Sequence, residues 1–233
     1  MIDIHCHILY GIDDGAKDLD ESLAMAKFAY EDGIRQIIAT PHFTKDHMND
    51  KKIIRDKVVQ LQQLLDKEQI PIKIHAGNEV RIESAAFIYE HTRKKSFHYL
   101  GNKSKFILLE QTWHAYNADT MEVAQWFMNQ GIQPIIPHPE RHSFFREQPG
   151  LLIDLIQKGC WTQVSVDSLL GKNTEDARLF AEWLVQHNCV HVLATDAHNI
   201  DRKPVLSVGY QIIESLAGIQ RVEEMHSRLK QIL

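Results

Sequence analysis

The chain has 233 residues, of which 44% are hydrophobic and 24% charged, and these proportions exclude a disordered or fibrous protein. Its formal net charge of -5 gives no sign of a nucleic-acid-binding surface or of attraction to an anionic membrane. Three widely spaced cysteines indicate free thiols rather than a disulfide framework. The length predicts a single domain over residues 1–233. No apolar run reaches the ~18 residues of a membrane span, and the start lacks a signal peptide, so we expect a cytoplasmic protein with no membrane insertion.

Short apolar segments rich in β-branched residues alternate with segments of helical periodicity along the chain. The predicted strands are Ile2–Ile4, Ile34–Ala39, Ile72–Ala76, Phe106–Leu109, Gln133–Ile136, Thr162–Val166 and Val190–Ala194. The predicted helices are Leu19–Asp32, Asp50–Lys67, Thr120–Gln130, Pro149–Lys158 and Thr174–His187. This alternation predicts a parallel sheet with right-handed crossovers, either an open doubly wound sheet or a closed barrel.

Potential metal ligands directly follow six of the seven predicted strands. They lie in the segments Asp3–His7, Thr40–His42, Gly77–Glu79, Glu110, Pro137–Arg141 and Thr195–Asn199. An open sheet forms its site in one crevice, whereas a barrel brings the carboxyl ends of all its strands to one mouth. The distribution therefore predicts a barrel with its site at the C-terminal ends of the strands.

Side-chain alternation separates ligands from neighbours within these segments. In an extended segment His5 and His7 point to one side and Cys6 to the other, so Cys6 is expected to pack behind the site. Seven histidines without a strand-end position are expected to be ordinary hydrogen-bonded residues: His75, His91, His98, His114, His187, His191 and His226. For His47 and His142 the sequence leaves both interpretations open.

The donor types narrow the metal and the chemistry. Imidazole and carboxylate donors without a cysteine cluster suit Mn, Fe, Co or Zn, and so many candidates indicate two or three ions. A cysteine-dependent phosphatase is excluded in its familiar form because Ile12, Val166 and Thr195 stand six positions after the three cysteines, where a phosphate-binding basic residue would be needed. Neither a phosphate-binding P-loop nor a Gly-x-Ser-x-Gly motif is present.

The motifs at His5 and His7, His42, Glu79, His138, and Asp196 to His198 resemble those of the polymerase-and-histidinol-phosphatase (PHP) superfamily. Together with the segments Met1–Lys17 and Pro137–Arg141, they are most similar to bacterial protein-tyrosine phosphatases encoded with capsule and exopolysaccharide genes. The similarity covers the chain to about Pro204. It implies a distorted seven-stranded (β/α) barrel, a phosphoric monoester hydrolase with three divalent ions, usually Mn²⁺ with Fe, Co, Zn or Mg as alternatives, and a metal-bound hydroxide as nucleophile.

The resemblance also implies roles for individual residues. One ion would be held by His5, His7, Glu79 and Asp196; a second by Glu79, Glu110 and His138; and a third by Asp14, His42 and His198. Arg141 would bind the phosphate oxygens, and the predicted catalytic residues are Arg141, His42 and Asp196. The family's second arginine is replaced by Lys203, next to Arg202, so either could bind substrate. Asp167 stands where relatives have glycine, and it could either repel an acidic peptide or cap a helix.

The implied substrate is the phosphorylated tyrosine-rich tail of an autophosphorylating bacterial tyrosine kinase. Two alternatives stay open: a small-molecule phosphatase of the histidinol-phosphate type, and a catalytically weak metal-dependent interaction module. A nuclease role is weaker because neither a basic patch nor a second domain is present to hold DNA.

Overall fold

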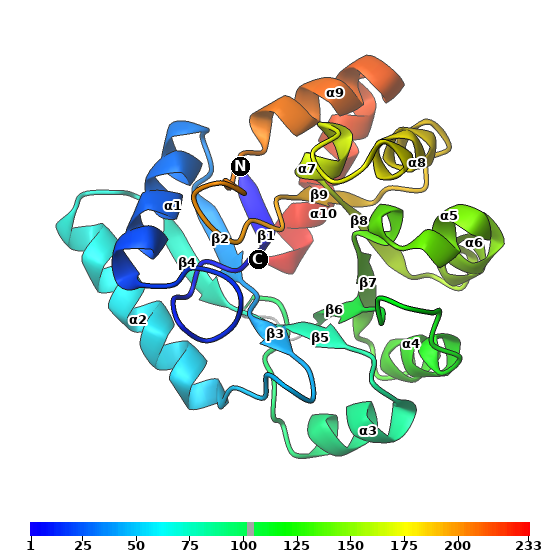
Figure 1. The fold of residues 1–233 in the computed structure, drawn as a ribbon, viewed down its shortest axis with the longest axis horizontal. Helices are drawn as coiled ribbons and strands as arrows, with labels where there is room; N and C mark the ends of the chain where they lie inside the picture. Colours follow the sequence, from blue (N-terminus) through cyan, green and yellow to red (C-terminus); the bar gives the residue numbers. More distant parts are fainter. Residues whose placement is uncertain (102–104) are drawn as a thin grey trace.

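The computed structural model describes residues 1–101 and 105–233, and within them the strands occupy the interior while the helices surround them (Figure 1). The strands are β1 (Ile2–Cys6), β2 (Gln36–Ala39), β3 (His42–Phe43), β4 (Lys73–Ala76), β5 (Glu79–Arg81), β6 (Phe106–Glu110), β7 (Gln133–Pro137), β8 (Trp161–Ser165) and β9 (Val192–Ala194). The helices are α1 (Leu19–Glu31), α2 (Lys51–Lys67), α3 (Ala85–Arg93), α4 (Thr120–Met128), η1 (Pro139–Arg141), α5 (Ser143–Glu147), α6 (Pro149–Gln157), α7 (Val166–Leu169), α8 (Glu175–Gln186), α9 (Ser207–Ala217) and α10 (Ile219–Ile232).

The strands form two parallel sheets, which confirms the predicted α/β class. One sheet has the order β1-β2-β4 and the other the order β3-β5-β6-β7-β8-β9, with every pair parallel. The segment after β9 also hydrogen-bonds to the end of β1: Asp196 N–H donates to the His5 carbonyl at 2.9 Å and His7 N–H to the Ala197 carbonyl at 2.8 Å. The first and last strands therefore meet where the predicted ligands lie.

Two predicted strands are each followed by a further short strand. The strand β2 stops before Pro41, which has no N–H to donate, and β3 begins at His42. Similarly, β4 stops before Gly77, where a Cβ atom would lie 2.7 Å from a methyl group of Ile38, and β5 begins at Glu79. Glu79 thus starts a strand instead of following one.

The hydrophobic core explains the elements that the sequence predicted well. All five residues of β6 are buried, as expected for a strand covered on both faces, whereas α2 buries only Ile54, Leu61 and Leu65, one stripe of an amphipathic helix. The sequence did not predict α3, α9 or α10. Across the described residues, every helix is too short or too polar to cross a bilayer.

Candidate metal centre

The predicted ligands converge at the C-terminal ends of the strands. His5 and His7 approach each other to 3.3 Å between their Nε2 atoms, so they share one side of β1 as alternation predicts. Cys6 is fully buried in the hydrophobic core, and burial raises the pKa of its thiol well above the usual range. The thiol therefore lies away from the centre and stays protonated.

Nine side chains make up four overlapping groups of donors, and within each group the ligand atoms lie within 4.8 Å of one another. The groups are His7-Asp14-His42-His198, His5-His7-Asp196, His5-Glu79-His138 and His42-Glu79-Glu110. These are the nine residues that the sequence singled out. The grouping of the described residues differs from the expected one. His7 joins Asp14, His42 and His198, and Glu79 is absent from the group of His5, His7 and Asp196. His138 joins His5, and Glu110 joins His42, with Glu79 common to both.

The hydrogen bonds of His5 and His7 leave their Nε2 atoms directed at the centre. His5 Nδ1 lies 2.8 Å from the amide oxygen of Gln163 and His7 Nδ1 lies 2.8 Å from a carboxylate oxygen of Asp13, and both oxygens are acceptors. Each Nδ1 therefore donates a proton, and Nε2 is the ring nitrogen that can bind an ion; the two Nε2 atoms lie 3.3 Å apart. Partners on Nδ1 are typical of metal-binding histidines.

Glu79 is the carboxylate that two of the donor groups share. It is fully buried, with one oxygen 2.8 Å from His138 Nε2 and the other 2.9 Å from His42 Nδ1. Yet neither Glu79 Oε2 nor His42 Nδ1 makes a hydrogen bond of acceptable geometry. Close donor atoms that are not aligned with each other fit a shared ion better than a direct hydrogen bond.

The ionisation of the centre reflects a high density of charge in a buried place. Burial disfavours the protonated form of His42, but Glu79 and Asp14 overcome this and raise its pKa to about 11. Burial, followed by the charge of Glu79, raises the pKa of Glu110 to about 7, although Arg81 opposes the shift. Divalent cations would offset the carboxylate charge that contributes to both shifts.

Two ligand positions adopt a left-handed backbone conformation. His138 has φ 33° and Asp196 has φ 52°, a region that side-chain-bearing residues rarely occupy. His138 follows directly on β7, and Asp196 lies two residues beyond the end of β9. Strain of this kind concentrates at functional sites, and here it turns both side chains toward the centre.

Two arginines meet at the Asp196 carboxylate. Arg141 Nη1 lies 2.5 Å and Arg202 Nη2 2.9 Å from the same oxygen, Asp196 Oδ2. Both arginines line a cavity of about 120 Å³ together with the candidate ligands Asp14, His42, Glu79, Glu110, His138, Asp196 and His198. Lys203 instead places its ammonium group 4.3 Å from the centroid of the Phe28 ring. Of the two sequence candidates, the structure brings Arg202 to the centre.

Other open positions lie outside the donor groups. His47 and His142 belong to none of the four, nor do the seven histidines expected to be ordinary residues, within the ranges that the structure describes. Asp167 is buried in α7 and pairs with Lys172 at 2.8 Å. It therefore neither lines the cavity nor presents a free charge to it.

Four functional side chains escaped the sequence analysis. Asp13 and Gln163 orient His7 and His5, Arg81 holds Glu110 through two hydrogen bonds, and Trp113 stacks on His138 with ring centroids 5.5 Å apart. Asp13 stands beside the predicted ligand Asp14, a signal that could have been used. Gln163 and Trp113 carry no such signal, because neither belongs to a spaced motif.

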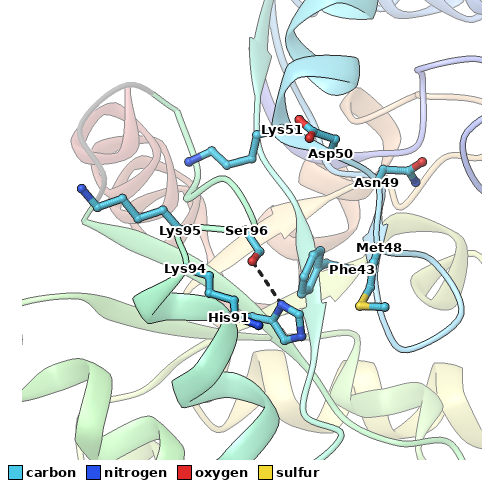
Figure 2. A pocket seen from close by; sticks show the side chains of 9 residues that line it. All are labelled: Phe43, Met48, Asn49, Asp50, Lys51, His91, Lys94, Lys95 and Ser96. Carbon is cyan, nitrogen blue, oxygen red and sulfur yellow. Dashed lines mark hydrogen bonds between the residues drawn. The ribbon is translucent and has the colours of Figure 1, made fainter.

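A separate cavity of about 330 Å³ lies on the other side of β3, lined by Phe43 and by residues at the ends of α2 and α3 (Figure 2). None of the nine ligands lines it. The side chains of His91 and Asp50 in this cavity could bind a metal, but both form hydrogen bonds to nearby residues. His91 Nδ1 lies 3.1 Å from Ser96 Oγ, and Asp50 Oδ1 accepts from the N–H of Lys52 at 2.6 Å. The chemistry is therefore concentrated at the metal centre.

Comparison with known proteins adds the family to this geometry. A family model for capsular polysaccharide synthesis, CpsB/CapC, matches residues 1–231. The chain belongs to this CpsB/CapC family. Among its relatives is the tyrosine-protein phosphatase YwqE of Bacillus subtilis, 38% identical over 201 residues that cover 86% of this chain and 78% of YwqE.

Solved structures give the same family and the same fold. A structure from a study of YwqE of Bacillus subtilis and CpsB of Streptococcus pneumoniae, described as unique metal-dependent tyrosine phosphatases, matches with a TM-score of 0.94 and 34% identity, covering 100% of this chain and 94% of the other. The histidinol phosphate phosphatase of Lactococcus lactis matches with a TM-score of 0.62 and 15% identity over 93% of each chain. The second match shows a shared fold only. The CpsB/CapC chain thus has the α/β fold of PHP-type phosphatases.

Proposed function

We propose that the chain is a metal-dependent protein-tyrosine phosphatase, a phosphoric monoester hydrolase. The observation that carries the proposal is the pairing of a cation site with an anion site: a cluster of imidazole and carboxylate donors, with two imidazole Nε2 atoms 3.3 Å apart, lies beside two arginines that converge on Asp196. Membership of the CpsB/CapC family, whose members YwqE and CpsB are described as metal-dependent tyrosine phosphatases, supports the same activity.

The fold assigned to this activity is a distorted seven-stranded (β/α) barrel. Counting β2 with β3, and β4 with β5, as single interrupted strands reduces the described strands to seven. The hydrogen bonds between the segment after β9 and β1 support closure. The ligands then lie at the C-terminal mouth of the barrel, the usual place of active sites in such folds.

The donor set fits two or three divalent ions. Nitrogen and oxygen donors without thiolates suit Mn²⁺, with Fe, Co, Zn or Mg as alternatives, and we propose the ligand roles that the sequence assigned to His5, His7, Asp14, His42, Glu79, Glu110, His138, Asp196 and His198. Bound ions would supply a nucleophile from water and would offset negative charge on the phosphoryl group. His42 lies 3.3 Å from Asp14 and belongs to two of the donor groups, so we assign it the role of a ligand instead of that of a proton donor.

The residues of the chain bind and orient the substrate in this proposal. A phosphoryl group entering the 120 Å³ cavity competes with Asp196 for Arg141 and Arg202, whose planar donors suit phosphate oxygens. Asp196 is then released toward His5, which lies 3.3 Å from its other oxygen. The chain needs no nucleophilic side chain, in agreement with the buried, protonated Cys6.

The proposed substrate is the phosphorylated tyrosine-rich tail of an autophosphorylating bacterial tyrosine kinase in the cytoplasm. The family link to capsular polysaccharide synthesis supports this partner. The test compares hydrolysis of a phosphotyrosine peptide, the matched phosphoserine peptide and histidinol phosphate by the Mn²⁺-loaded protein, with His5→Ala as the inactive control. We expect the highest kcat/KM for phosphotyrosine. A preference for histidinol phosphate would contradict the proposal, and absence of all hydrolysis would favour an interaction module.

A further inference from the structure

Three cavities that share side chains lead from the metal centre onto the surface of α8. The metal-centre cavity shares Trp113 and Arg141 with a middle cavity of about 240 Å³. The middle cavity shares Arg146 with a distal cavity of about 440 Å³. The path runs between α5, which carries Arg146, and α8, two helices that are in contact and lie side by side in Figure 1.

Trp113 stands at the start of this path and is 39% exposed. Its ring lies nearly parallel to that of His138, at an interplanar angle of 9°, and the Arg141 guanidinium carbon is 4.8 Å from its centroid. The neighbouring cavity is small and lined almost entirely by charged groups and imidazoles, so it suits a phosphate better than an aryl ring. The ring of a bound phosphotyrosine would then lie at the rim, where Trp113 offers an aromatic surface.

The middle cavity is built for an acidic side chain. It is lined by Arg141, Arg146, Asn173 and Thr174, besides Trp113 and Ala177, and by no carboxylate. Arg146 donates one hydrogen bond, from Nη1 to the Glu140 carbonyl at 2.9 Å, and among the described residues no carboxylate lies within 4 Å of its guanidinium. Its charge is therefore free to pair with a ligand.

The distal cavity is apolar along α8. Leu179 is 50% exposed, and the stacked rings of Phe180 and Trp183, 5.6 Å apart, complete its wall. Glu147 and Asp176 also line it, which disfavours a second acidic residue at this end. An exposed apolar wall bounded by polar groups is typical of a peptide-binding surface.

We propose that these cavities form one groove for a phosphotyrosine peptide that has an acidic residue beside the phosphotyrosine and an apolar residue further along. Trp113 contacts the aryl ring, Arg146 pairs with the acidic residue, and Leu179, Phe180 and Trp183 receive the apolar one. The inference rests on the proposed phosphatase function, because it names the peptide sequence that the same site selects.

The test measures binding separately from turnover. Each peptide carries a non-hydrolysable phosphonate analogue of phosphotyrosine with a glutamate next to it. A leucine stands two to four positions beyond the glutamate, and peptides with these residues on either side of the phosphotyrosine analogue are measured. Matched peptides replace the glutamate by glutamine or the leucine by serine. Fluorescence anisotropy with the Mn²⁺-loaded protein gives Kd. Arg146→Gln should raise Kd for the glutamate peptide roughly three- to tenfold and leave the glutamine peptide within about twofold. Leu179→Asp should do the same for the leucine peptide relative to the serine peptide.

Matched controls lie on α2, away from the groove. Arg55→Gln and Val59→Asp remove an exposed charge and an exposed apolar side chain and should change no Kd. Hydrolysis of the small substrate para-nitrophenyl phosphate is measured for both groove variants in parallel, so that a change at the metal-centre cavity, which neither residue lines, is distinguished from a loss of peptide contacts. Equal losses for the matched peptides, or none, would overturn the groove. Failure of the phosphatase function would be seen separately, as absent turnover of phosphotyrosine peptides that still bind with this selectivity.

Discussion

Asp196 holds two kinds of partner with its two carboxylate oxygens. One oxygen faces His5 at 3.3 Å, and the other accepts from Arg141 and Arg202. Burial opposes ionisation of this carboxyl, but His5, His198 and the neighbouring charges hold its pKa well below the usual range. One ionised group thus connects the proposed ion site with the proposed phosphate site.

Arg202 and Lys203, the two basic residues that follow His198, should differ in their contribution to activity. Arg202→Ala should lower kcat/KM strongly, whereas Lys203→Ala should leave it within about twofold, because Lys203 lies over Phe28 instead of at Asp196. Loss of a positioned donor of this kind costs roughly 10²- to 10³-fold, and Arg141→Ala should fall in the same range. Steady-state kinetics, with metal content checked by elemental analysis, decides. A larger loss for Lys203→Ala would show that this segment rearranges when substrate binds.

Substitution of Cys6 tests the direction in which the side chains at the end of β1 point. Cys6→Ala should retain most activity, because the thiol is buried, protonated and turned into the core, while His7→Ala should abolish it. The substitution should lower the free energy of unfolding modestly, as removal of a small core side chain does. Kinetics and chemical denaturation of the two variants give both readouts. A loss of activity in Cys6→Ala as deep as that in His7→Ala would contradict this role.

At the scale of the elements, the strands could be predicted from apolar runs in the sequence. The breaks within two of these strands could not. The seven segments lie where strands form, because predominantly apolar stretches of three to six residues are typical of strands that are buried on both faces. The breaks at Pro41 and Gly77 depend on local backbone chemistry inside those runs. The nine donor residues that lie together could be picked out from their positions at or near strand ends, whereas Gln163 is a core position within β8, whose role appears only when His5 is brought opposite it.

Glu140 connects η1 with β8 through a buried hydrogen bond from Ser165 N–H to its carboxyl group at 3.0 Å. Burial raises its pKa to about 7, although this hydrogen bond opposes the shift. The folded chain therefore binds this proton more tightly than the unfolded chain, whose carboxyl titrates near its usual value of about 4.3. Between these two values the folded state loses stability as the pH rises.

Glu140→Gln should remove this loss. The amide oxygen still accepts from Ser165 and carries no charge, so the variant should gain stability relative to the unchanged chain as the pH rises from about 4 to about 7. The difference should approach at most ~3 kcal/mol. Urea denaturation of the metal-free proteins across this pH range measures it. A constant difference in the free energy of unfolding would show that folding does not shift the pKa of Glu140.

At the scale of the whole molecule, metal binding should raise the Tm of the protein. Ions that bind only the folded chain raise its stability by ~2.7 kcal/mol at a concentration one hundred times Kd. We therefore expect a chelator to lower Tm and abolish activity, and Mn²⁺ to restore both. His5→Ala should show a reduced Tm response and Cys6→Ala an unchanged one. Equal Tm values with and without chelator in the unchanged chain would contradict an ion at this centre.

The contact between the first and last strands has a consequence for biosynthesis. The ribosome makes His5 and His7 almost two hundred residues before Asp196 and His198, which face them in the folded chain. The ion site cannot be complete until that later segment has emerged, and neither can the hydrogen bonds between β1 and the segment after β9. An ion that binds this centre would therefore be bound late in synthesis, at a stage when all the strands that precede this segment have already emerged.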